Sequence, residues 1–346
     1  MARLERAVRV LLHIALCIAA GAVSLAAQKA ILLVGSGSSV PSPLYGAWAD
    51  QYAKLKNGVQ VRYLPLGTSE GIRQISQGVG DFGAGEIPLT DAQMHKGKIP
   101  LVQFPTVLVA IVPIYRLPGE TQPELNFSGE LLAEVFLGNV KNWRDVRIAK
   151  LNPGVDLPDL PITVVHRSAG KGSNYILTDY LAKVSPQWKT KIGKSASPEW
   201  PVGEDTNRSE DMVEKVTTTL GAIGFVELNY AQRKDLGAGS LENAAGVFIR
   251  ATPASIAAAC AANQKKGAAD FGSSLTAAES KDAYPMVSFT RVYAVASGMD
   301  PSRLQALKDF WTWALTAGQE TAAQLGYTPL PPAIAAKARE AVNSIQ

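Results

Sequence analysis

The sequence predicts an α/β protein built from two lobes. Its 346 residues are enough for about two domains of ordinary size. Short apolar runs that suit buried strands alternate with segments whose apolar residues recur at helical spacing, as in sheets covered by helices on both faces. Hydrophobic residues make up 47% of the chain and charged residues 18%, which is typical of a globular protein and not of a disordered one.

The first 27 residues have the pattern of a secretory signal peptide, because three arginines precede an apolar run that ends in small alanines. A membrane anchor is the alternative, since the run over 10–27 approaches the length that spans a bilayer. Lipid modification of Cys17 is a minor alternative, because the bulky residue before it does not suit such sites. We therefore expect export to the periplasm or another extracytoplasmic compartment.

The composition of the exported chain argues against several classes of function. Without residues 1–27 the chain holds 31 basic and 29 acidic residues, and this net charge of +2 gives little support for nucleic-acid binding. Cys260 is then the only cysteine, so no intramolecular disulfide can form. His95 and His166 are the only histidines left, too few for a zinc cluster. We expect no metal, no cofactor, no nucleic-acid partner and a monomeric protein.

The exported chain opens with a βαβαβ pattern. Apolar runs and alternation predict the strands, and apolar residues three and four apart predict the helices between them. These elements imply a parallel sheet covered on both faces. The predicted order is a strand over 30–34, a helix from Pro41, a strand over 59–63, a helix over 72–79 and a strand over 81–84.

Two longer strands predict crossings between the lobes. A strongly apolar strand over 107–112 runs into a proline-rich stretch, which we interpret as the first crossing. Alternating residues over 287–295 predict a long strand that carries the chain back. Strands are also predicted over 162–165 and 222–226, with helices near 131–136, 212–220 and 304–315 and from about residue 333.

The two crossings divide the exported chain into one lobe that is discontinuous in sequence and one that is continuous. Lobe 1 is expected to comprise residues 28–110 and 286–346, so it is discontinuous in sequence. Lobe 2 is expected to comprise residues 111–285. The crossings themselves are then the hinge.

Three loops share one design, since each leaves the carboxyl end of a predicted strand and enters a helix. They are residues 35–41 (GSGSSVP), 67–71 (GTSEG) and 167–173 (RSAGKGS). Ligands of open α/β sheets bind at this edge, where helix N-termini present unpaired N–H groups to an anion. Glycine allows close approach of the backbone, and serine or threonine adds an O–H donor. Three such loops with one arginine predict a site for a small oxyanion.

Spacing excludes two nucleotide motifs and one catalytic motif. GSGSSV has Val40 where a dinucleotide fingerprint needs its third glycine, and Gly172 follows the lysine of AGKGS where a phosphate loop needs serine or threonine. No GxSxG motif surrounds Ser36, Ser38 or Ser39. A secreted phosphatase is therefore a weaker hypothesis than a protein that binds its ligand unchanged. We do not expect the protein to be an enzyme.

Ten segments follow one another in order along nearly the whole exported chain. They are GSGSSVPSPLYGAWADQY, GTSEGIRQI, DFGAGEIPLTD, QFPTV, LGNVKNWRD, IAKLNPG, VVHRSAGKGSNYILTDYLAKV, WPVG, GAIGFVE and AYPMVSFT. Together they resemble the periplasmic phosphate-binding proteins of ABC phosphate importers. The resemblance implies a type II periplasmic-binding fold, in which two α/β lobes with mixed sheets are joined by a two-strand hinge and close over one phosphate. It also implies delivery of phosphate to an ABC permease in the membrane.

The resemblance assigns ligand-binding roles to residues of all three loops. Glu86 stands where the family usually has an aspartate that accepts a hydrogen bond from the proton of phosphate. A carboxylate there repels fully ionised sulfate, so the resemblance implies selectivity for phosphate. Hydroxyl donors are expected from Ser39, Thr68 and Ser173, backbone N–H donors from Val40 and Gly172, and a guanidinium donor from Arg167.

Three residues depart from the family pattern. Glu86 is one methylene longer than aspartate, Lys171 replaces a serine, and Glu70 replaces a glycine. With Arg167 their charges sum to zero, so Lys171 either pairs with an acid or contacts the anion directly, and we favour contact. Glu70 is either a solvated residue at the rim or a functional one. A further possibility is that these changes suit the fold to another oxyanion or to a sensor that transports nothing.

Overall fold

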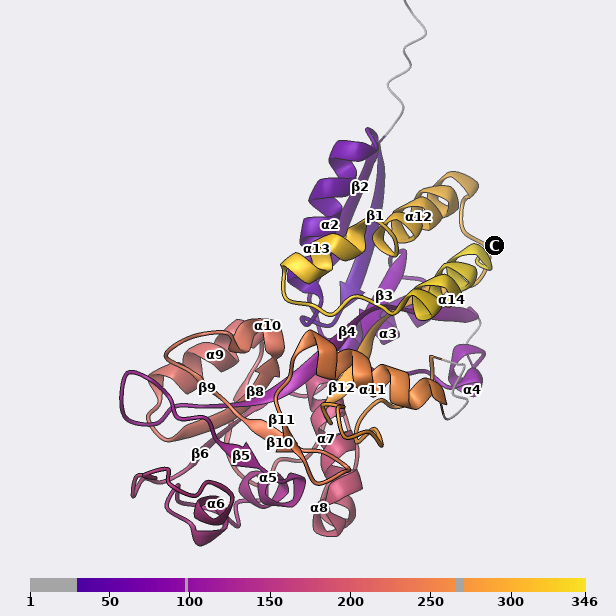
Figure 1. The fold of residues 1–346 in the computed structure, drawn as a ribbon. Helices are drawn as coiled ribbons and strands as arrows, with labels where there is room; N and C mark the ends of the chain where they lie inside the picture. Colours follow the sequence, from indigo (N-terminus) through magenta and orange to yellow (C-terminus); the bar gives the residue numbers. More distant parts are fainter. Residues whose placement is uncertain (1–29, 97–98, 266–270) are drawn as a thin grey trace, which may run out of the picture.

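The computed structural model describes residues 30–96, 99–265 and 271–346, so the predicted signal peptide lies outside the described residues. Figure 1 shows two lobes, one formed by the two ends of the described chain and the other by its middle. The first stretch has the predicted βαβαβ order. Its elements are β1 (Ile31–Gly37), α2 (Ser42–Leu55), β2 (Val59–Leu64), α3 (Thr68–Ser76), β3 (Phe82–Gly85) and α4 (Asp91–Met94).

A mixed sheet forms the centre of the first lobe. β1 lies between β2 and β3 and is parallel to both. β12 (Val287–Val295) lies between β3 and β4 (Leu101–Tyr115) and is antiparallel to both, which gives the order β2-β1-β3-β12-β4. A strand from the end of the chain therefore fills the middle of a sheet whose other strands come from its beginning.

β4 belongs to both lobes. Up to Ala110 it pairs with β12, and from Ile111 onward it pairs with β8 (Ala222–Glu227). β8 is parallel to β6 (Thr163–Arg167), and β6 is parallel to β7 (Glu204–Thr206). One continuous sheet path thus runs from the first lobe into the second through β4.

The sequence predicted a shorter strand over 107–112 because prolines flank it, whereas β4 covers 101–115 and contains Pro105 and Pro113. Pro105 lies opposite Arg291 at the point where the register of the β4–β12 ladder shifts. The register passes from Val107 to Pro105 and leaves Thr106 out, and proline is tolerated in a strand beside such a bulge because the ladder is already interrupted there.

The second lobe surrounds β6, β7 and β8 with helices and carries a small second sheet in the order β11-β10-β5. After β12 has returned the chain to the first lobe, three helices follow, α12 (Pro301–Ala314), α13 (Gly318–Gln324) and α14 (Pro332–Asn343). The other elements between β4 and β12 are β5 (Asn126–Phe127), α5 (Gly129–Phe136), α6 (Val146–Leu151), α7 (Gly172–Val184), α8 (Pro186–Lys191), α9 (Ser209–Thr218), α10 (Leu228–Ala231), β9 (Gly237–Ala238), β10 (Ser240–Glu242), β11 (Phe248–Ile249) and α11 (Pro253–Lys265).

Aromatic packing ties the two ends of the chain together. Tyr45 and Trp48 stack on α2 with ring centroids 5.5 Å apart, and Trp311 on α12 meets Tyr45 edge to face at 5.3 Å. Phe82 of β3 packs edge to face against Trp311 at 5.0 Å. These buried rings contribute large apolar areas, so α12 holds α2, which follows the first loop, and β3, which precedes Glu86.

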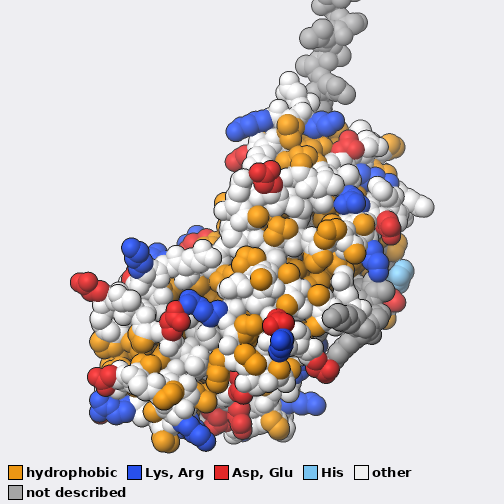
Figure 2. All heavy atoms as spheres, in the orientation of Figure 1, with side chains coloured by type: hydrophobic (Ala, Val, Ile, Leu, Met, Phe, Trp, Pro, Cys, Tyr) orange, Lys and Arg blue, Asp and Glu red, His pale blue; other side chains and the backbone are white. Residues whose placement is uncertain are grey.

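The face of the molecule drawn in Figure 2 carries Lys and Arg side chains interspersed with Asp and Glu over both lobes. This face shows no continuous basic stripe of the kind that follows a phosphodiester backbone. Within the residues that the structure describes, no helix combines the length and the apolarity needed to cross a bilayer.

Candidate functional site

The three loops predicted to bind an anion come together between the lobes. The Ser69 N–H donates to the Gly170 carbonyl over 3.1 Å, so the first turn of α3 touches the loop before α7. The Gly67 N–H donates to the Gly37 carbonyl over 2.7 Å, which joins the first two loops. Gly67 has φ +106°, a conformation that favours glycine at this turn. We call the meeting point of residues 35–41, 67–71, Glu86 and 167–173 the seam.

Arg167 ends β6 and is fully buried in the seam. Its Nη2 donates to Ser39 Oγ of the first lobe over 3.2 Å and to the Asn207 carbonyl over 2.9 Å. Its Nη1 donates to Ser209 Oγ over 3.2 Å, whereas Nε has no hydrogen-bond partner among the described residues. Burial lowers the pKa of Arg167 from its ordinary value, but a guanidinium stays charged in proteins. The structure therefore provides a buried cation with an uncommitted donor.

Glu86 follows β3 and is also fully buried. Its Oε2 accepts from Thr68 Oγ1 over 3.0 Å and its Oε1 accepts from Thr290 Oγ1 over 3.1 Å. Burial raises the pKa of Glu86 to about 7, although hydrogen bonds from Ser38, Thr68 and Thr290 oppose that rise. The carboxyl group can therefore exchange a proton near neutral pH.

Gly172 brings the second lobe against this carboxyl group. A Cβ built on Gly172 would lie 1.7 Å from Glu86 Oε2 and 2.7 Å from Thr68 Oγ1, so no side chain fits at this position. Gly172 is the first residue of α7, and the N–H groups of a first helical turn have no partner within the helix. Glu86, Thr68 and the start of α7 thus share one small volume.

The remaining predicted donors have varied surroundings. Ser173 is buried in the first turn of α7, and Ser39 is half-buried and bonded to Arg167. The Val40 N–H donates to Ser38 Oγ over 3.1 Å, so an anion would have to take this donor from Ser38. The structure places all eight predicted residues in the seam, and their contact with a ligand remains a prediction.

Lys171 and Glu70 do not pair with each other. Lys171 is buried, its Nζ donates to Asn207 Oδ1 over 2.7 Å, and burial together with the charge of Arg167 lowers its pKa. Glu70 forms an ion pair with Arg73 at 2.6 Å on the open side of α3, which lowers the pKa of Glu70 to about 2. Lys171 and Glu70 therefore have separate partners, Asn207 and Arg73. Pairing of Lys171 with an acid and its contact with an anion both remain predictions.

Glu227 is the residue to which sequence reasoning gave no role. It ends β8, is 1% exposed, and has no hydrogen-bond partner for either carboxylate oxygen among the described residues. An acid directly after a fully buried strand, inside the segment GAIGFVE, was the available signal. Its charge acts on both Arg167 and Glu86, so it belongs to the surroundings of the seam.

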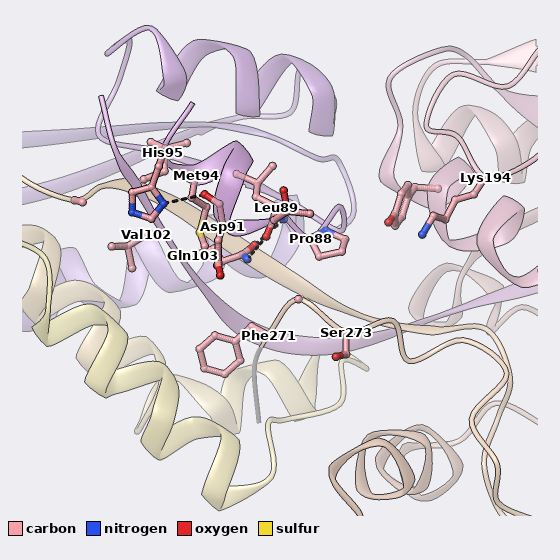
Figure 3. A pocket seen from close by; sticks show the side chains of 15 residues that line it. Pro88, Leu89, Asp91, Met94, His95, Val102, Gln103, Lys194, Phe271 and Ser273 are labelled. Atoms are coloured by element: carbon pink, nitrogen blue, oxygen red, sulfur yellow. Dashed lines mark hydrogen bonds between the residues drawn. The ribbon is translucent and has the colours of Figure 1, made fainter. Parts of the chain in front are cut away.

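A groove of ≈ 820 Å³ lies beside the seam and contains none of the predicted ligand residues. Figure 3 shows Pro88, Asp91 and His95 on one wall, with Lys194 and Phe271 across from them. Its polar groups are partly satisfied by the backbone, as in the bonds of Gln103 to Leu89 and of His95 to Asp91. No cluster of three potential metal ligands occurs in the described part of the chain.

Comparison with known proteins decides the family. A family model described as the PBP superfamily domain matches residues 23–317. The phosphate-binding protein PstS of Pasteurella multocida is 37% identical over 89% of this chain and 89% of its own length. The chain belongs to the PstS family of phosphate-binding proteins. The PstS protein of Xylella fastidiosa strain Temecula1 is 34% identical over 88% of this chain and 83% of its own length.

Solved structures of low identity support the fold. An ABC-type phosphate transport receptor from Vibrio cholerae has a TM-score of 0.57 at 16% identity and covers 86% of this chain and 100% of its own. A human phosphate-binding apolipoprotein has a TM-score of 0.69 at 16% identity and covers 89% and 93%. The predicted α/β fold with a mixed sheet, of the periplasmic-binding type, and the predicted family are confirmed.

Proposed function

We propose that this protein captures inorganic phosphate in the seam, outside the cytoplasm, and delivers it to the permease of an ABC importer without chemical change. The observation that carries the proposal is a buried arginine beside three glycine- and hydroxyl-rich loops, in a chain of the PstS family. Helix N-termini, hydroxyls and a guanidinium replace the hydration shell of an oxyanion. The named function of the relatives supports phosphate as that anion.

The ligand-binding residues of the proposal come from both sides of the seam. The first lobe, residues 28–110 and 286–346, contributes Ser39, Val40, Thr68 and Glu86. The second lobe, residues 111–285, contributes Arg167, Lys171, Gly172 and Ser173. Because β4 and β12 connect the lobes, bending there opens and closes the seam.

Glu86 should make the selectivity of the site for phosphate over sulfate depend on pH. An ionised carboxylate accepts a hydrogen bond from protonated phosphate and repels sulfate, which carries no proton. The pKa of Glu86 is about 7, so below neutral pH the protonated acid can donate to sulfate instead. We expect discrimination against sulfate to sharpen as the pH rises above 7.

The test is calorimetric titration of the exported form with phosphate, sulfate and arsenate at pH 6 and pH 8. The proposal expects one tight phosphate site per chain, and sulfate competition that is weaker at pH 8 than at pH 6. Phosphate esters should remain uncleaved on long incubation, which separates binding from a secreted phosphatase. A folded protein that binds a different oxyanion in preference to phosphate would refute the proposal.

A further inference from the structure

The two carboxylate oxygens of Glu86 face different parts of the protein. Oε2 accepts from Thr68 Oγ1 over 3.0 Å and lies beside Gly172, where a built Cβ would come within 1.7 Å of it. Oε1 accepts from Thr290 Oγ1 of β12 over 3.1 Å. One oxygen therefore lies at the start of α7, where the anion is proposed to bind, and the other is held on a strand that connects the lobes.

Thr290 is itself held in place at an irregular point of β12. The register of the β4–β12 ladder shifts directly after Thr290, and Thr106 of β4 is left out of the pairing. Thr106 Oγ1 donates to the Thr290 carbonyl over 3.2 Å and shares a hydrogen bond of 2.8 Å with the Tyr45 hydroxyl. All three side chains are at most 1% exposed. Bulges of this kind re-aim side chains, and here the Thr290 hydroxyl is fixed toward Glu86.

Glu86 needs such a hold because its side chain is long and buried. It has one more rotatable bond than aspartate, and fixing that bond costs conformational entropy. An ionised carboxylate can accept about four hydrogen bonds. The hydroxyls of Ser38, Thr68 and Thr290 supply three donors, so one acceptor position remains for a proton on the ligand. Loss of the Thr290 hydroxyl would let the carboxyl group rotate and would leave Oε1 with one donor fewer.

We propose that Thr290 is a positioning residue of the anion site, which holds Glu86 Oε1 against β12 so that Oε2 faces the ligand as an acceptor for its proton. This inference rests on the proposed function and names a residue that sets the selectivity of that site. A hydrogen bond to an ionised carboxylate is about twice as strong as one between neutral groups, so the Thr290 hydroxyl favours the ionised form. It thereby opposes the rise in the pKa of Glu86 to about 7 that burial causes.

The other titratable groups around Glu86 are the same in every variant compared below. Arg291 donates to the Glu86 carbonyl over 3.0 Å, and the charge of Glu227 raises the pKa of Glu86. A difference between variants therefore reports the Thr290 hydroxyl. The remaining groups have partners of their own, which are Thr106 for Tyr45, the Ser38 carbonyl for Tyr63, the Ile87 carbonyl for Tyr293, Ser39 for Arg167 and Asn207 for Lys171.

The experiment compares Thr290→Val, which removes the hydroxyl, with the natural exported chain. Calorimetric titration from pH 6 to pH 9 measures phosphate binding and its competition by sulfate. In the natural chain the ratio of the sulfate to the phosphate dissociation constant should rise through about pH 7. In Thr290→Val phosphate affinity should fall about tenfold, and the rise in the ratio should move about one pH unit higher, because a buried carboxylate loses one donor.

A second measurement needs no ligand. A carboxyl group whose pKa is raised by folding loses its contribution to stability until the pH passes its pKa in the folded protein. The free energy of unfolding of Thr290→Val, measured in urea, should therefore keep falling above pH 7 relative to that of a control variant. The stability gap between the two should widen with pH.

Two variants serve as controls. Thr290→Ser keeps the hydroxyl and should restore the natural affinity and pH profile. Thr328→Val makes the same replacement at a buried threonine of the first lobe whose Oγ1 has no hydrogen-bond partner among the described residues, and it should behave as the natural chain.

Three results would contradict the inference or the function on which it rests. An unchanged pH profile with a constant stability gap in Thr290→Val would overturn the inference, as would a Thr290→Ser variant as impaired as Thr290→Val. A folded natural chain that binds no phosphate would reject the proposed function, and a stability gap that widens above pH 7 would then still confirm the hold of Thr290 on Glu86.

Discussion

The two sides of the seam present different chemistry to the same volume. The first lobe offers neutral hydroxyls and one acid, with Glu86 accepting from Thr68 and Thr290. The second lobe offers two cations, Arg167 and Lys171, and the start of α7. Each side alone would bury charges without balance, so closure of one on the other is favourable only because they differ. In the proposed function an anion would contact both sides at once, because the cations attract it and the acid distinguishes an anion that carries a proton from one that does not.

Among the variants considered, removal of Arg167 should cause the largest loss of phosphate affinity. Arg167→Ala deletes the buried guanidinium that bridges to Ser39, and we expect phosphate affinity to fall by about a hundredfold or more. Calorimetric titration measures the loss. Arg73→Ala, which removes an exposed arginine of α3, serves as the control and should keep full affinity. Equal affinity of Arg167→Ala and the natural chain would remove Arg167 from the site.

Replacing Glu86 with a neutral residue should change the pH dependence of the free energy of unfolding. Burial raises the pKa of Glu86 from 4.5 to about 7, so its contribution to stability is complete below about pH 4.5 and is lost as the pH rises through 7. Glu86→Gln should therefore gain stability relative to the natural chain between pH 5 and pH 8, by up to about 3 kcal/mol. Urea unfolding without ligand at pH 5 and pH 8 measures this difference in stability. Glu214→Gln, which neutralises an exposed carboxylate, is the control. A stability gap that does not grow with pH would contradict a buried, proton-exchanging Glu86.

Lys171 should have a smaller effect on binding. Lys171→Ser restores the residue usual in the family and removes one of the two cations, so phosphate affinity should fall about tenfold. Lys189→Ser on the exposed side of α8 and Glu70→Gln on α3 should each leave the affinity unchanged. If Lys171→Ser lowers the unfolding temperature and leaves the affinity intact, the lysine supports Asn207 and does not bind the anion.

The sequence predicted most of the first lobe because its signals are local. Alternation and helical spacing are read within a dozen residues, and they located β1, α2 and β2. The length of β4 was missed because Pro105 argues against a central strand, and only the facing strand shows that a bulge accommodates it. That partner lies far along the chain and cannot be read from the proline's neighbours.

The candidate site shows the same limit. The three loops were predicted because glycine, hydroxyls and strand ends occur together in short stretches. The hydrogen-bond partner of Lys171 was not predicted. This partner, Asn207, lies in the loop between β7 and α9, and nothing in RSAGKGS indicates that the two residues meet. Glu227 was passed over because an acid at the end of a strand usually faces solvent, and its burial depends on pairing with Ile111 of β4, more than a hundred residues earlier in the chain.

The place of β12 has a consequence for biogenesis. As the polypeptide emerges, β3 and β4 are made early, yet the strand that separates them is synthesised almost two hundred residues later. Until β12 arrives, two apolar strand edges stand open and can pair wrongly with each other or with another nascent chain. A truncation before residue 287 should therefore aggregate and not yield a smaller soluble product, and maturation of the first lobe must wait until nearly the entire polypeptide is released.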